Sequence, residues 1–183
     1  MKHRITISNM ALQWLYAMMA KVIVSNRGSA KNINIFFEKV RPIAGDFETA
    51  QENFDAQITG HRQIWSETNE KHQERLLVAR LTEQGQTPTS KEVAYASPEE
   101  QAEVEQKLKS IEKTIDDLRD NRKTLRETKT TVDFSDEEFN FLNASVDSVL
   151  ATSSESPKGW IAGDSLVGLT VEVIEALETS EQI

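Results

Sequence analysis

The stretch "EKVRPIAGDF" (residues 38–47) places a proline and a glycine inside an otherwise helical pattern, and so determines whether the chain has one long helix or several short ones. Apolar residues recur through it at alternating steps of four and three, the spacing of one stripe along a helix. The stripe begins earlier and continues beyond it, at Ile33, Phe37, Val40, Ala44, Phe47, Gln51, Phe54, Ile58, His61 and Trp65. Pro42 and Gly45 fall off this stripe, and a helix that ended at Pro42 would have no reason to resume in the same phase. We therefore predict one helix from about residue 29 to about residue 80, kinked near Pro42, whose ring crowds the preceding turn.

A second stripe of the same spacing follows a polar linker at 82–97. Ser97 is suited to cap a helix, and Pro98 to occupy its first position. The stripe consists of Val104, Leu108, Ile111, Ile115, Leu118, Arg122 and Leu125. We expect this helix to fold back on the first as an antiparallel coiled-coil hairpin, with Ile111 and Ile115 among its most buried residues.

Two short stretches outside the hairpin resemble each other in pattern. "RITIS" (4–8) alternates polar and apolar residues and leads into an apolar helix at roughly 9–25, and "TTVDFSDEEFNFL" (130–142) repeats this order. Two short strands meeting at the base of the hairpin fit this pattern, and a coincidence of patterning fits it equally.

Cap and stop residues place the remaining boundaries. Ser8 or Asn9 can cap the first helix, Gly28 can end it, and Ser29 can cap the long one. A last helix is predicted over 164–178. The expected fold is mainly α and forms a single domain over 1–183, with a hairpin arm at about 47–126 and a small helical base at about 1–46 and 127–183.

Composition excludes several classes of function. The net charge is −9, and the 21 basic residues are scattered among 30 acidic ones, so direct nucleic-acid binding is disfavoured. There is no cysteine, which excludes disulfides, thiol catalysis and cysteine metal sites. The apolar run Met10–Val24 is shorter than the roughly 20 residues that cross a bilayer, so we interpret it as a buried helix and expect no membrane partner.

Few residues suggest a catalytic or metal-binding role. His61 and His72 lie near one helical stripe but too far apart to share a metal ion. The acidic groups at 116–117 and 136–138 lack a visible catalytic partner. We therefore expect no catalytic residue, metal or cofactor. Trp160, in "GWIAGDS" (159–165), is a candidate partner contact, although a tryptophan that plugs the base of the core fits it better.

The order of the predicted elements resembles that of a group of known proteins. It runs from "ITIS" through "KNINIFFEKVRPIAGDFETAQENF" to "VDFSDEEFNFL" and "VEVIEALE". In this order the chain resembles a loosely defined family of small, mostly helical bacteriophage proteins of unknown function, encoded among late structural genes. The resemblance covers about two thirds of the chain and rests on pattern. It implies a phage origin and a role in the virion, its assembly or infection, with no catalytic residues to carry over.

Four hypotheses about function follow. The first is a non-enzymatic phage structural or assembly protein, located in the virion or the host cytoplasm, whose partners are other phage structural proteins or itself. The second is a phage inhibitor that binds a host defence protein through its acidic surface. An enzyme and a host adaptor protein are the remaining hypotheses.

Overall fold

The computed structural model describes residues 1–22, 27–154 and 164–183, and these form two compact units. One unit, here called the base, comprises Met1–Ala50 and Thr124–Ile183, and the other, the hairpin, comprises Gln51–Lys123. The expected arm and base differ from these units by only a few residues at each boundary. Both units lie within the single domain expected over 1–183, and that expectation stays a prediction.

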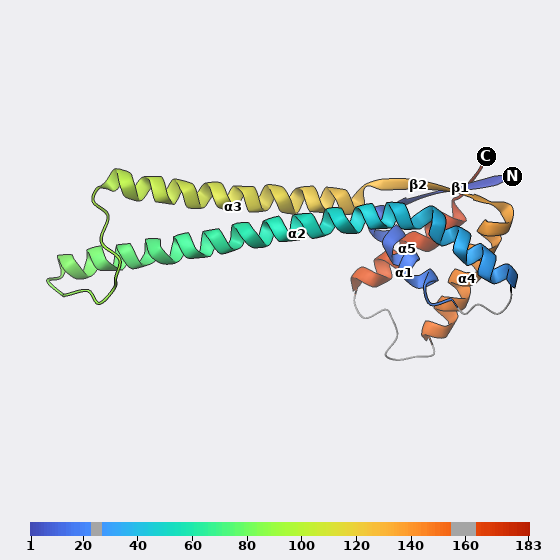
Figure 1. Ribbon diagram of the computed structural model, residues 1–183, viewed down its shortest axis with the longest axis horizontal. Coiled ribbons are helices and arrows are strands. Elements are labelled where there is room, and N and C mark those ends of the chain that lie inside the picture. Colours follow the sequence, from blue (N-terminus) through green and yellow to red (C-terminus); the bar gives the residue numbers. More distant parts are fainter. Residues whose placement is uncertain (23–26, 155–163) are drawn as a thin grey trace. The chain divides into compact units, whose positions relative to one another are not determined.

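The chain is mainly helical, as predicted (Figure 1). In order, its elements are β1 (Lys2–Ser8), α1 (Asn9–Met19), α2 (Arg27–Glu83), α3 (Pro98–Glu127), β2 (Lys129–Ser135), α4 (Asp136–Ser154), α5 (Asp164–Glu178) and β3 (Glu181–Gln182). The bounds of α5 and the start of α3 coincide with the predicted ones.

A small antiparallel sheet organises the base, in the strand order β2-β1-β3. Ile5 is paired with Val132, so the two stretches that resemble each other in sequence are neighbouring strands, as the first of the two interpretations predicted. The strand β3 was not predicted. It pairs with β1, and the backbones of Lys2 and Ile183 exchange two hydrogen bonds of 3.1 and 2.9 Å beside it.

The core of the base lies on one face of this sheet. Alternate residues of β1 and β2 point inward, which is why Ile5, Ile7, Val132 and Phe134 are buried whereas Thr6 is exposed. The helices α1, α4 and α5 and the first part of α2 lie on that face (Figure 1), and their side chains pack against these strand residues. The buried members from these helices are Ala11, Leu12, Leu15, Met18, Met19, Ile33, Phe36, Val40, Ala44, Phe139, Leu142, Val146, Val173, Ala176 and Leu177.

The helix α2 continues through Pro42, which confirms the predicted continuity. Pro42 is exposed, so its ring faces solvent and displaces no core residue. The kink near Pro42 stays a prediction.

Two predicted boundaries near the start of α2 are wrong. The helix α2 begins at Arg27, so Gly28 and Ser29 lie within it and act neither as stop nor as cap. The helix α1 ends at Met19, not near residue 25, because Lys21 N–H and Val22 N–H bond to carbonyls three residues back and tighten the chain into a turn.

The hairpin consists of the later part of α2 and most of α3, which run antiparallel. Arg122 of α3 forms an ion pair with Asp55 of α2, whereas Glu100, earlier in α3, pairs with Arg75, later in α2. Between these pairs lies an apolar cluster of Ile58, Ile111 and Ile115, with Trp65 and Leu118 packed against it. The knobs-into-holes packing of a coiled coil stays a prediction.

Candidate functional site

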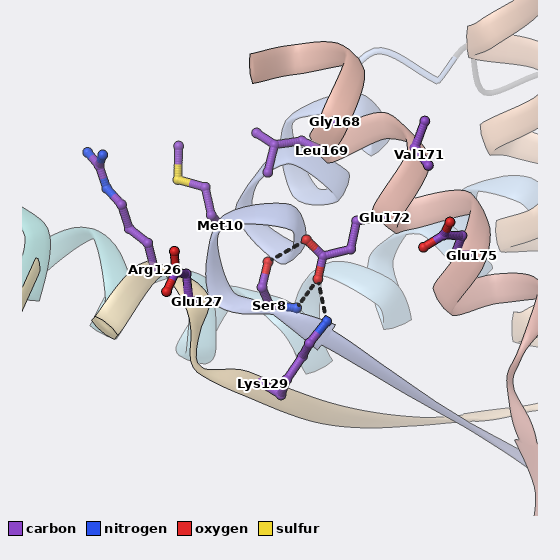
Figure 2. A pocket seen from close by; sticks show the side chains of 10 residues that line it. All are labelled: Ser8, Met10, Arg126, Glu127, Lys129, Gly168, Leu169, Val171, Glu172 and Glu175. Atoms are coloured by element: carbon purple, nitrogen blue, oxygen red, sulfur yellow. Dashed lines mark hydrogen bonds and ion pairs between the residues drawn. The ribbon is translucent and has the colours of Figure 1, made fainter. Parts of the chain in front are cut away.

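A carboxylate joins three elements of the base at the end of β1. Glu172 of α5 accepts hydrogen bonds from the Ser8 backbone N–H at 2.9 Å, the Ser8 hydroxyl at 2.9 Å and Lys129 Nζ at 2.7 Å (Figure 2). Desolvation alone would raise the pKa of Glu172, but these hydrogen bonds outweigh it and hold its pKa below the ordinary value. Glu172 is therefore held in its charged form by its neighbours.

The grouping of Ser8, Glu172 and Lys129 contains the residue types of a hydrolase site, but its geometry is structural. Ser8 is buried, and its oxygen already accepts the Ala11 N–H at 3.2 Å as the cap of α1. Its proton is donated to Glu172, and Lys129 also points to that carboxylate. A nucleophile needs a base within reach of its hydroxyl and room for a substrate. Here the Ser8 hydroxyl already donates one hydrogen bond to Glu172 and accepts one from the Ala11 N–H.

Beside this cluster lies an open groove of about 540 Å³ (Figure 2). Met10, Leu169 and Val171 provide its apolar lining, and Arg126 and Glu175 are among its charged residues. Val171 is 46% exposed. The groove combines apolar side chains with charges of both signs, a composition suited to contact with another protein.

A second polar cluster fixes the start of α4. Ser135 and Glu138 form a capping box: the Ser135 N–H donates to Glu138 at 2.8 Å, and the Glu138 N–H donates to the Ser135 hydroxyl at 3.4 Å. Lys39 donates to the same carboxylate and to the Asp133 carbonyl. Burial tends to raise the pKa of Glu138, but the bonds from Lys39 and Ser135 lower it below its ordinary value. The acids at 136–138 thus serve the helix terminus.

The turn of the hairpin is attached to its helices by an aromatic and ionic cluster. The Tyr95 hydroxyl lies 2.6 Å from Nδ1 of His72, which is buried, and the Arg75 guanidinium stacks 3.8 Å from the Tyr95 ring. Arg75 also bonds to the Val93 carbonyl and to Glu100. Burial raises the pKa of Tyr95, so its hydroxyl stays protonated at neutral pH. His72 therefore holds the linker in place, a role that its position on the helical stripe did not reveal.

A second groove, of about 350 Å³, lies in the hairpin. Here it is called the Trp65 groove, and it is lined by Arg62, Trp65, Glu112, Ile115, Asp116 and Arg119. Trp65 Nε1 is buried, and within the part of the chain that the structure describes it has no hydrogen-bond acceptor. Buried donors are rarely left unpaired, so this indole is an exception among the side chains of the hairpin.

The predicted stripe residues differ in burial, and none of them is exposed. The buried members are Ile33, Val40, Ala44, Phe47, Ile58, Leu108, Ile111 and Ile115. The half-buried members are Phe37, Gln51, Phe54, His61, Trp65, Val104, Leu118, Arg122 and Leu125. Phe36, which lies off the stripe, is 3% exposed and stacks on Phe134 in the base. Trp160, the predicted partner contact, lies outside the described residues.

Two further findings bear on function. Within residues 1–22, 27–154 and 164–183, no group of three or more His, Asp or Glu side chains is arranged to hold a metal ion. Over the same ranges, no helix combines the length and apolar character that crossing a bilayer requires.

No protein-family model, curated protein or solved structure matches this chain in sequence or fold.

Proposed function

We propose that this protein is a non-enzymatic structural or assembly protein of a bacteriophage that acts through helical protein–protein contacts. The observation that carries the proposal is the incomplete burial of the apolar stripe in the hairpin. Phe54, Val104 and Leu118 are only half-buried there, and Leu118 packs against a cluster of three buried isoleucines. A partner helix that covers them would remove further apolar surface from water, at about 25 cal/mol per Å².

The polar clusters support a non-enzymatic role. Ser8, Glu172 and Lys129 hold elements of the base together, and Ser135 and Glu138 cap a helix. Each hydroxyl and carboxylate in these clusters is engaged by another residue of the same chain. Side chains committed in this way serve the fold, whereas a catalytic pair must face a substrate.

The phage assignment rests on the resemblance in the order of elements. A phage structural role places the protein in the virion or in the host cytoplasm, with other phage structural proteins or further copies of itself as partners. The net charge of −9 suits a protein that must stay soluble until it docks, and it disfavours direct contact with nucleic acid. The proposal includes no cofactor and no membrane partner.

The same net charge supports one alternative, a phage inhibitor that binds a basic surface of a host defence protein. The charged residues are mixed in sign along α3, as at Asp116 and Arg119, and this mixing favours the structural proposal.

Purified particles distinguish the two functions. Virions and assembly intermediates, freed of lysate protein, should contain this chain in a fixed ratio to the major capsid protein when measured by quantitative mass spectrometry. Its absence from both preparations would overturn the structural proposal, and the inhibitor would then be the better hypothesis.

A further inference from the structure

The Trp65 groove contains two opposite charges that no described residue of the chain pairs. Arg62 of α2 and Glu112 of α3 both line it, both are exposed, and within the described residues neither has an ion-pair partner. Their neighbours Asp116 and Arg119 are paired with each other at 2.8 Å on the surface of α3. As far as the structure describes the chain, the groove therefore presents an unpaired Arg62 and an unpaired Glu112, on different helices, beside the apolar side chains of Trp65 and Ile115.

We propose that a second copy of this chain docks on the Trp65 groove, with Arg62 of each copy paired to Glu112 of the other. In a two-fold dimer the same patch meets itself, so a contact from one residue to another is necessarily repeated in reverse. A single unpaired Arg and a single unpaired Glu on one surface satisfy this requirement. This inference rests on the proposed contact function and names a second copy as the partner.

The balance of charge favours a second copy over other occupants. The chain as a whole carries −9, so two copies repel each other over most of their surface. The groove has two arginines against two acids and is locally neutral, so repulsion is weakest there. A nucleic acid would require a surplus of cations, and a strongly basic partner would require a surplus of acids.

Trp65 provides the apolar part of the contact. Tryptophan and arginine are the residue types most often found at the energetic centre of interfaces, within a ring of side chains that excludes water. Ile64, the neighbour of Trp65 in α2, is 47% exposed and extends the apolar surface. Because the groove is small, we expect a weak dimer, with a dissociation constant in the micromolar range.

Charge reversal tests the pairing in the full-length chain. Sedimentation equilibrium of the wild type should show a mass that rises towards twice that of the monomer as concentration increases. Arg62→Glu and Glu112→Arg should each remain monomeric, since each single reversal places like charges together at both pairs. The double variant Arg62→Glu with Glu112→Arg should recover the dimer, and an equimolar mixture of the two single variants should form a heterodimer.

The control is Lys71→Glu, which makes the same change of charge at an exposed position of α2 outside the groove and should dimerise like the wild type. Circular dichroism should give equal helix content for all variants. A wild type that stays monomeric at its highest soluble concentration would overturn the proposal. So would dimerisation of Arg62→Glu equal to that of the wild type. The particle measurement is independent, because a monomer can be part of a virion and a dimer can be absent from one.

Discussion

The base surrounds Leu142 and Val40 with other apolar side chains, whereas the hairpin places Ile58, Ile111 and Ile115 between two helices only. The base also joins residues far apart in sequence, as in the bond from Ser8 to Glu172, whereas the hairpin pairs residues of helices joined by one short linker. A core covered by a sheet and several helices needs no partner. A core between two helices leaves the apolar side chains beside it half-covered. This difference suggests that the base maintains the fold while the hairpin provides the contact surface.

The largest expected effect is a loss of stability in the base. Leu142 is 1% exposed, and Leu142→Ala removes apolar volume that the surrounding elements cannot refill. We expect the free energy of unfolding to fall by about 4 kcal/mol, within the range for buried leucines. Urea denaturation followed by circular dichroism measures it. Asn140→Ala, at an exposed position of the same helix, is the control, and an equal effect of the two substitutions would contradict the described core.

Ile115→Ala should cost less than Leu142→Ala, because a core between two helices can collapse around the cavity. Ile115 is 6% exposed, and we expect a loss of about 2 kcal/mol, the lower end of the range for such truncations. Hydrogen exchange should show the loss of protection in residues 51–123. A change below about 0.5 kcal/mol, the size typical of surface substitutions, would mean that α3 does not pack on α2.

Two matched caps compare the base with the hairpin. Ser8 and Ser97 each accept the amide three residues later at 3.2 Å, but Ser8 also donates to the half-buried Glu172 of another helix, whereas Ser97 bonds to the exposed Glu99 of its own helix. Ser97→Ala should therefore cost about 1 kcal/mol and Ser8→Ala about 2 kcal/mol. Equal losses in urea denaturation would show that the Glu172 bond adds nothing to the cap.

Acid should weaken the base through Glu172 and Glu138. Both have pKa values below the ordinary one, so their contribution is present above the unfolded-state value of about 4.3 and is lost as the pH falls through the folded value. For Glu172, which is partly exposed, we expect less than about 1 kcal/mol. Unfolding measured from neutral pH down to pH about 3 should show a shallower acid slope for Glu172→Gln than for the wild type. Identical slopes would mean that this carboxylate does not titrate differently on folding.

The smallest effect is expected at Trp65. Trp65→Phe removes an indole N–H that finds no acceptor among the described residues, and it keeps most of the aromatic ring. The removal of an unpaired buried donor is favourable and the loss of ring area is unfavourable, so the net change should lie within about 0.5 kcal/mol. A larger loss in urea denaturation would indicate that the indole nitrogen has a partner.

Local patterns allowed much of the fold to be predicted from the sequence. The apolar spacing through Pro42 predicted a continuous α2, and Ser97 with Pro98 predicted the start of α3. The end of α1 and the strand β3 were missed, because turns of one or two residues and a strand of two residues leave little periodicity to detect. Phe36 was missed because a single stripe describes a helix with one partner, whereas this part of α2 is also covered by Phe134.

The candidate sites were less predictable, since they depend on contacts between distant residues. Glu172 is one of several acids in α5, and no local pattern indicates that it reaches Ser8. His72 was recognised as a polar position on the stripe, but its partner Tyr95 lies in the linker, where no periodicity applies. The pairing of the two resembling strands was the exception, because the same alternation occurred twice.

The separation of β1 from its partners has a consequence for synthesis on the ribosome. β1 leaves the ribosome before α2 and α3, whereas its neighbour β2 and the residue that binds its last amide, Glu172, follow only after these two helices have been made. The hairpin, by contrast, is complete once residue 123 has emerged, because its contacts need no residue made later. The nascent chain should therefore form the hairpin while the apolar residues of β1 and α1 are still exposed to solvent. At this stage a chaperone has the largest apolar surface to bind.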